Sequence, residues 1–117
     1  MKKILIIGAG RSSSSLIDYL LEKSTMYDWF ITVADQSLDL AIQKTKGHQR
    51  SKAVSFNALD PNERAPYLGE SDLVVSMLPA HLHIDIAIDC LALGIHLATA
   101  SYISDEQGPF ERNVEPV

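Results

Sequence analysis

A glycine-rich turn near the amino terminus has the residue types and spacing of an anion-binding loop. Gly8-Ala9-Gly10 follows the short apolar run Lys3 to Ile7, and apolar residues then recur at helical spacing. Glycine at position 8 permits a backbone turn that other residues cannot readily adopt, and glycine at position 10 lets a pyrophosphate approach the main chain. Because the N–H groups at the start of the next helix would face that anion, the turn predicts phosphate binding.

This loop matches a dinucleotide-binding fingerprint with one departure. The pattern Gly-x-Gly-x-x-Gly wants Gly or Ala at the third position, where the chain has the small residue Ser13. The candidate cofactor contacts of the loop are Gly8, Ala9, Gly10, Arg11, Ser12 and Ser13. For the two serines, helix capping is an alternative that is compatible with phosphate binding.

Asp35 ends a second apolar run, Trp29 to Ala34, roughly 20 residues past the glycines. Dinucleotide-binding folds place an acceptor for the adenosine ribose hydroxyls there, and a solvated acid is the alternative. A carboxylate would repel a 2′-phosphate, and Gln36 stands where an NADP site often has Arg, so NAD is favoured over NADP. Arg11 could still pair with a phosphate, which leaves NADP open.

Two further strand ends carry candidate contacts. Asn57, with Ala58 beside it, follows a third strand, and its amide oxygen could accept from the adenine amino group or form a loop. The fourth strand ends in residues that could touch ribose or nicotinamide: Ser76, Met77, Leu78 and Pro79. The alternative for Pro79 is that it only terminates the strand.

The pattern of elements predicts the frame that positions these residues. Strands are expected at residues 3–7, 29–34, 53–56, 73–78 and 95–99, with a loop from Glu22 to Asp28. Helices fill the other connections, so the fold class is α/β: a Rossmann-type doubly wound parallel sheet of order 3-2-1-4-5 with helices on both faces.

Helix signals support this frame. Ser37 is a predicted N-cap, and Asp60, Pro61 and Glu63 read as N-cap, first helical position and capping-box partner. The last helix has one apolar stripe, Ile84, Ala87, Ile88 and Leu91, and Gly94 at its end.

Composition narrows the function. The 117 residues suffice for one domain, and the net charge of −5 argues against nucleic acid. A lone cysteine, Cys90, is expected to be buried in a reducing compartment, and no run reaches membrane-spanning length, so a cytoplasmic protein is expected. His81 and His83 point apart on a helix, so no metal site is expected.

Four stretches together resemble the amino-terminal nucleotide-binding domain of the saccharopine dehydrogenase family, which includes saccharopine reductases and carboxynorspermidine synthase. They are residues 6–11, 33–35, 72–79 and 99–104. The first two are generic to dinucleotide-binding folds. The Ser-x-Leu-Pro ending at Pro79 and the Ser-Tyr-Ile-Ser beginning at Ser101 are more specific.

The resemblance implies an NAD(P)-dependent oxidoreductase acting on the CH–NH group of amino-acid adducts, as in lysine metabolism. It implies a cofactor domain over residues 1–104 and a second substrate domain that is absent here. Residues 105–117 have little periodicity, which predicts a linker or tail. By the same resemblance, Ser101 and Tyr102 would face an amino-acid-derived substrate, and an ordinary polar strand exit is the alternative. The general acid or base would lie in the missing domain. A docking surface left open in this way could let two copies form a homodimer.

Two other hypotheses remain open. A stand-alone nucleotide-sensing domain of the potassium-transport regulator type would explain the length without truncation. A degenerate scaffold that binds nothing would rest on Ser13 and Asn57.

Overall fold

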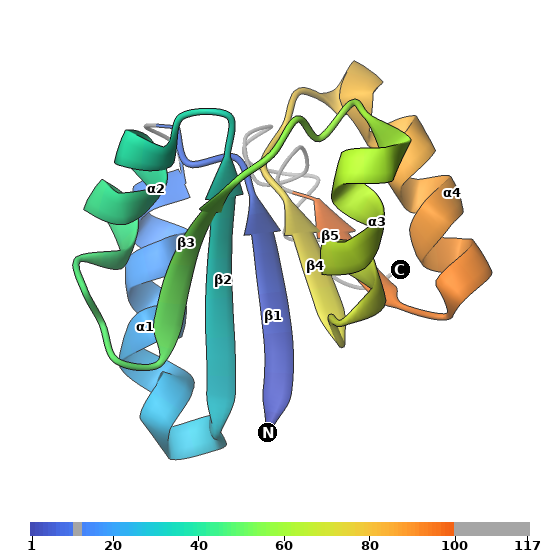
Figure 1. Cartoon of the computed structure of the whole chain (residues 1–117). Coiled ribbons are helices and arrows are strands. Elements are labelled where there is room, and N and C mark those ends of the chain that lie inside the picture. The colour runs from blue at the N-terminus through green and yellow to red at the C-terminus, as the bar shows by residue number, and fades with distance from the viewer. Residues whose placement is uncertain (11–12, 100–117) are drawn as a thin grey trace, which may run out of the picture.

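The computed structural model describes residues 1–10 and 13–99, which form one twisted parallel sheet with helices on both faces (Figure 1). The strands are β1 (Lys2–Ile7), β2 (Trp29–Asp35), β3 (Ser51–Ser55), β4 (Leu73–Ser76) and β5 (His96–Thr99). Their order is β3-β2-β1-β4-β5, and all neighbours are parallel, so the predicted fold class and strand order are confirmed.

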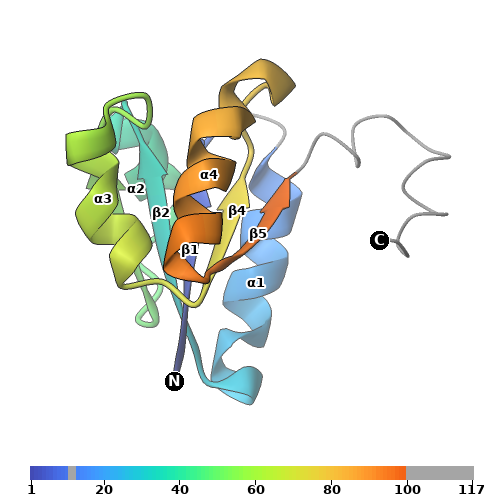
Figure 2. The same cartoon turned by 90° about the vertical axis from the view of Figure 1, so that its right-hand side faces the viewer.

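Helices α1 (Ser14–Tyr27) and α2 (Leu38–Thr45) cover one face of the sheet. Helices α3 (Pro61–Gly69) and α4 (His83–Leu93) cover the other, and the short 3₁₀ helix η2 (Ala80–Leu82) leads into α4. Figure 2 shows the sheet edge-on between α1 and the α3–α4 pair. Because the strands are parallel, the loops at their carboxyl ends meet at one edge, where ligands bind in open α/β sheets.

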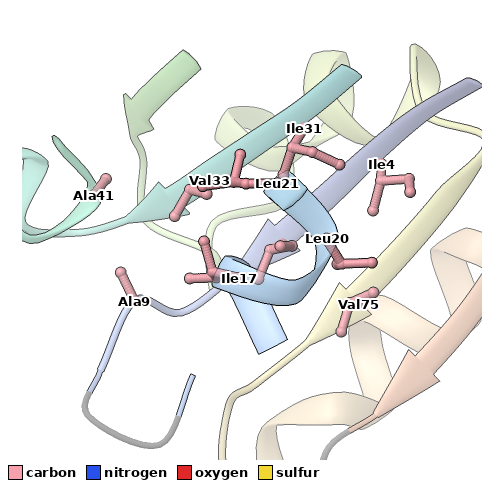
Figure 3. Packing of buried hydrophobic residues seen from close by; sticks show 10 residues of the cluster. Ile4, Ala9, Ile17, Leu20, Leu21, Ile31, Val33, Ala41 and Val75 are labelled. Atoms are coloured by element: carbon pink, nitrogen blue, oxygen red, sulfur yellow. The ribbon is translucent and has the colours of Figure 1, made fainter. Parts of the chain in front are cut away.

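The apolar alternation of β1 divides the core in two. Ile4 and Ile6 point to the face covered by α1, where they pack with Ile17 and Leu21, as Figure 3 shows for most of this cluster. Leu5 and Ile7 point to the other face, against residues of α3 and α4. Since β1 is buried on both faces, its nearly continuous apolar sequence is explained by its central position.

Several element ends differ from the sequence prediction. Helix α1 continues to Tyr27, so the loop predicted from Glu22 to Asp28 is wrong; the buried Ser24 donates its hydroxyl hydrogen to the Leu21 carbonyl inside this last turn. Strand β3 begins at Ser51 instead of position 53, because backbone pairing with β2 starts there. Strand β4 ends at Ser76 rather than at position 78.

The helix caps are mostly as predicted. The Ser37 hydroxyl accepts from the Leu40 N–H, and Gly94 ends α4 with φ at 71°. Asp60 caps α3 by accepting from Asn62, and Pro61 is its first residue. The predicted capping box is wrong, because Glu63 bonds elsewhere, in the candidate site described below.

The apolar stripe of α4 does not face the sheet. Its large members Ile84, Ile88 and Leu91 are 63%, 58% and 83% exposed. The residues that α4 buries lie on another side of the helix, and they are His83, Ile86 and Cys90. Cys90 is thus buried as predicted, but the stripe forms an apolar surface that the described residues leave uncovered.

Candidate dinucleotide-binding site

The glycine turn is held tightly at the carboxyl end of β1. The Gly8 N–H donates to the Ala34 carbonyl at 2.8 Å, and the Met77 N–H donates to the Ile7 carbonyl at 2.8 Å. Gly8 has a φ of 104°, and a Cβ there would lie 3.3 Å from the Met77 Cβ. The backbone conformation therefore favours glycine at position 8, and the closeness of Met77 adds to this preference.

Gly10 differs from Gly8 in what surrounds it. A Cβ at Gly10 would meet no atom within 4 Å, and the residue is exposed. Nothing in the described fold requires glycine there. The open space is what the close approach of a pyrophosphate to the main chain would need, as the sequence analysis predicted.

Asp35 joins the ends of three elements. One carboxylate oxygen accepts from the Ala9 N–H at 2.9 Å, and the other accepts from the Ser37 N–H at 2.8 Å. The side chain thus ties the glycine turn to the end of β2 and to the start of α2. It is half-buried, which leaves part of the carboxylate open to a ligand.

A pocket of about 180 Å³ opens beside Asp35. It is lined by Ile7, Gly8, Ala34, Asp35, Gln36, Phe56, Asn57, Ala58, Leu59, Leu78 and Leu82. Pockets that enclose a whole drug-sized ligand hold roughly 300–1,000 Å³, so this one suits a part of a dinucleotide. Its lining is mainly apolar with one carboxylate and two amides, which suits a flat base and a polar ribose.

The wall formed by residues 56–59 is ordered by local hydrogen bonds. The Asn57 side-chain oxygen accepts from the Leu59 N–H at 3.0 Å, which is a loop-forming turn. The Asn57 N–H donates to Glu63 at 2.8 Å, and this contact replaces the predicted capping box. The loop-forming role of Asn57 is therefore present, and its contact with adenine stays a prediction.

Ser13 fills the position where the fingerprint has Gly or Ala. It is fully buried, and its hydroxyl donates to the Gly10 carbonyl at 2.7 Å. Its N–H donates to the same carbonyl at 3.0 Å. Serine is thus accommodated by hydrogen bonds inside the turn, and its side chain makes no cap hydrogen bond to α1. The contact of Ser13 with a phosphate stays a prediction.

Ser76 does not line the pocket beside Asp35. It is fully buried, and its hydroxyl lies 2.8 Å from Nδ1 of His83, at the start of α4. Burial lowers the pKa of His83 from its ordinary value, because the charged imidazolium loses its hydration. The contact of Ser76 with the cofactor stays a prediction, and Leu78 lines the pocket.

The remaining predicted contacts are placed as follows. The Met77 backbone borders Gly8, and Pro79 is exposed, with its carbonyl accepting from the Leu82 N–H. Neither residue lines the pocket beside Asp35. Four predicted contacts lie outside the described residues: Arg11, Ser12, Ser101 and Tyr102.

Among residues 1–10 and 13–99, no group of three histidine, cysteine or acidic side chains is close enough to hold a metal ion. In the same part of the chain, none of the helices combines the length and the apolarity that a membrane crossing needs.

Some pocket residues escaped the sequence analysis. Phe56 precedes Asn57 and Leu59 follows Ala58, so the predicted strand end there was the signal that could have found them. Leu82 belongs to η2, which no periodic pattern marks. The pairing of Ser76 with His83 needed the fold, because the two residues belong to different elements.

Comparison with known proteins gives one family. Residues 4–115 match the family described as the saccharopine dehydrogenase NADP binding domain. The match continues past Ser104, where the sequence motifs placed the end of the resemblance. The boundary between a domain and a tail at that point remains a prediction.

Relatives of established name match most of the chain. It is 32% identical to alpha-aminoadipic semialdehyde synthase of Arabidopsis thaliana, over 88% of this chain and 11% of that one. It is 30% identical to saccharopine dehydrogenase [NADP(+), L-glutamate-forming] of Saccharomyces cerevisiae, over 98% of this chain and 24% of the relative. The chain therefore spans less than a quarter of the length of these two relatives.

A solved structure gives the same result. Apo saccharopine dehydrogenase (L-Glu forming) from Saccharomyces cerevisiae superposes with a TM-score of 0.77 at 28% identity, over 99% of this chain and 24% of that one. Since the family match covers nearly all of the sequence, the chain belongs to the saccharopine dehydrogenase NADP binding domain family.

Proposed function

We propose that this chain binds the adenosine half of a nicotinamide dinucleotide in the pocket beside Asp35, with the pyrophosphate over Gly10. The observation that carries the proposal is the junction at Asp35, whose carboxylate is tied to the glycine turn and borders a mainly apolar pocket. In this arrangement the carboxylate accepts from the ribose hydroxyls, and the open space at Gly10 admits the diphosphate.

We further propose that Asp35 favours NAD over NADP. A carboxylate at the ribose repels a 2′-phosphate, and the neighbouring Gln36 brings no positive charge. The family description and the name of the budding-yeast relative carry NADP, which makes this the open part of the proposal. A dinucleotide site is the coarser statement and does not depend on it.

Calorimetric titration of the 117-residue chain with NAD and NADP in parallel tests both statements. We expect saturable binding with NAD favoured, and loss of that preference in Asp35→Ala because the repulsive charge is gone. Asp39→Ala is the matched control, since Asp39 is an exposed acid in the first turn of α2 that does not line the pocket.

The outcomes separate the coarser statement from the finer one. Tighter binding of NADP by the unaltered chain would reject the preference and keep the dinucleotide site. If neither NAD nor NADP binds, the site itself is rejected.

For the whole protein we propose a saccharopine dehydrogenase-like oxidoreductase. The bound cofactor would supply hydride transfer to or from the CH–NH carbon of an amino-acid adduct, and the described residues would hold and orient it. We assign no general acid or base to this chain. The matched family supports this proposal over a stand-alone nucleotide-sensing domain, which has the same fold class.

A further inference from the structure

Helix α3 supports three consecutive residues of the pocket wall. The supporting contacts are Phe56 with Tyr67, Asn57 with Glu63, and Ala58 with Arg64. The first is a stack of two rings with centroids 4.6 Å apart. In the second, the Asn57 N–H donates to the Glu63 carboxylate at 2.8 Å, and in the third, Arg64 donates to the Ala58 carbonyl at 3.0 Å. The shape of the wall therefore depends on where α3 lies.

Arg64 differs from the other two supports because it is buried and bonded in two directions. Only 4% of the residue is exposed. Its Nη1 donates to the Ala58 carbonyl at 3.0 Å, and its Nε donates to the Asp89 carboxylate at 2.7 Å. A buried guanidinium without partners is costly, so moving either the Ala58 carbonyl or the Asp89 carboxylate away would destabilise the fold. Arg64 therefore holds both partners in place.

Asp89 lies on α4, so Arg64 links the pocket wall to the second helix on this face of the sheet. We infer that Arg64 is a positioning residue for the dinucleotide: it fixes the Ala58 wall at the spacing that a flat base requires. This inference rests on the proposed function, because it assumes that the base enters this pocket.

The guanidinium suits this role better than an ammonium would. Its planar fork presents N–H groups in fixed, diverging directions, so one side chain can serve a carbonyl and a carboxylate at once. A lysine would keep the charge but would not reproduce the fork. Arg64→Lys is therefore expected to retain only part of the effect.

The chain offers a matched control in Arg50. Its Nε also donates to a backbone carbonyl, that of Trp29 at 3.1 Å, and its guanidinium also pairs with an aspartate, Asp28. Neither Arg50 nor its partners line the pocket beside Asp35. Arg50→Met thus removes the same kinds of contact without touching the wall.

The test compares the unaltered chain, Arg64→Met, Arg64→Lys and Arg50→Met in NAD titrations, at a temperature where circular dichroism shows each variant folded. We expect Arg64→Met to weaken NAD binding about tenfold, the loss typical of a charge-assisted hydrogen bond. The NAD affinity of Arg64→Lys should lie between those of Arg64→Met and the unaltered chain, and Arg50→Met should bind NAD as the unaltered chain does.

Amide hydrogen exchange gives a readout that needs no nucleotide. In Arg64→Met the amides of Asn57 and Leu59 should exchange faster, while that of Ala9, held by Asp35, should not change. A general loss of stability would speed all three.

Each outcome decides between the two proposals. If the unaltered chain binds neither NAD nor NADP, the proposed function fails and the inference fails with it; if it binds NADP alone, the same comparison of variants is made with NADP. If the unaltered chain binds NAD but Arg64→Met changes neither affinity nor exchange at the wall, or Arg50→Met matches it, only the positioning role is overturned. Should Arg64→Met not fold, Asp89→Asn removes the charge partner from α4 and is expected to shift both readouts in the same directions by a smaller factor.

Discussion

The two halves of the carboxyl edge of the sheet differ in what they present. At the ends of β1, β2 and β3, the backbone turn at Gly8, the carboxylate of Asp35 and the wall at Asn57 surround one pocket. At the end of β4, the hydroxyl of Ser76 is closed off by His83. In the described part of this edge, an open pocket thus lies beside a buried hydroxyl.

The helices that flank these halves differ in the same sense. Helix α3 places buried and polar side chains against the pocket wall. Helix α4 buries Ile86 but leaves Ile84, Ile88 and Leu91 exposed. The comparison teaches that the pocket proposed for the adenosine half is lined by described residues, whereas the described residues at the end of β4 and on α4 present a buried hydroxyl and exposed apolar side chains.

The largest effect that we expect contrasts two isoleucines of α4. Ile86→Ala should lower the free energy of unfolding by about 2–5 kcal/mol, because Ile86 is fully buried in the core below α4. Ile88→Ala, with the side chain 58% exposed, should change it by less than about 0.5 kcal/mol. Urea unfolding measures both. A loss in Ile88→Ala as large as that in Ile86→Ala would show that the stripe is covered in solution.

A smaller effect distinguishes the two glycines of the turn. Gly8→Ala should cost about 1–3 kcal/mol of stability, since alanine is strained at a φ of 104° and its Cβ would press on Met77. Gly10→Ala should leave stability almost unchanged but weaken NAD binding, because the methyl group takes the space proposed for the pyrophosphate.

Thermal unfolding and NAD titration of both glycine variants check this. If Gly10→Ala bound NAD as tightly as the unaltered chain, the pyrophosphate would have to lie elsewhere.

A third prediction concerns pH and His83, the partner of the buried Ser76 hydroxyl. Burial lowers the pKa of His83 below its ordinary value of 6.5, so the unfolded chain takes up this proton at a higher pH than the folded chain. The free energy of unfolding should therefore fall as the pH drops below about 6.5.

His83→Asn should reduce this slope, and His81→Asn, at an exposed position, should not. Urea unfolding at a series of pH values measures the slope for both variants. Equal slopes in all three proteins would mean that His83 does not carry the effect.

The features that depend on local residue patterns and on general rules of fold topology could be predicted from the sequence. The strand order, the caps at Ser37 and Asp60, and the place of Asp35 follow from periodicity, capping rules and fold topology. The stripe of α4 misled because periodicity shows that a helix has an apolar side but not which neighbour covers it. The partner of Ser76 could not be predicted, because His83 belongs to another element.

The support of the pocket wall by Arg64 was not predicted, for a related reason. A lone arginine in a short helix normally indicates a solvated face. Its burial arises from the crossing of α3 and α4, where the Asp89 carboxylate and the Ala58 carbonyl meet it from two sides. Only the packed structure brings these groups together.

The most direct test of the difference between the two halves is to titrate the chain separately with the two halves of NAD, AMP and nicotinamide mononucleotide. We expect AMP to bind saturably, within about tenfold of NAD (about 1.4 kcal/mol), and nicotinamide mononucleotide to bind far more weakly. Equal binding of the two halves, or binding of nicotinamide mononucleotide alone, would contradict the proposal that the pocket beside Asp35 binds the adenosine half.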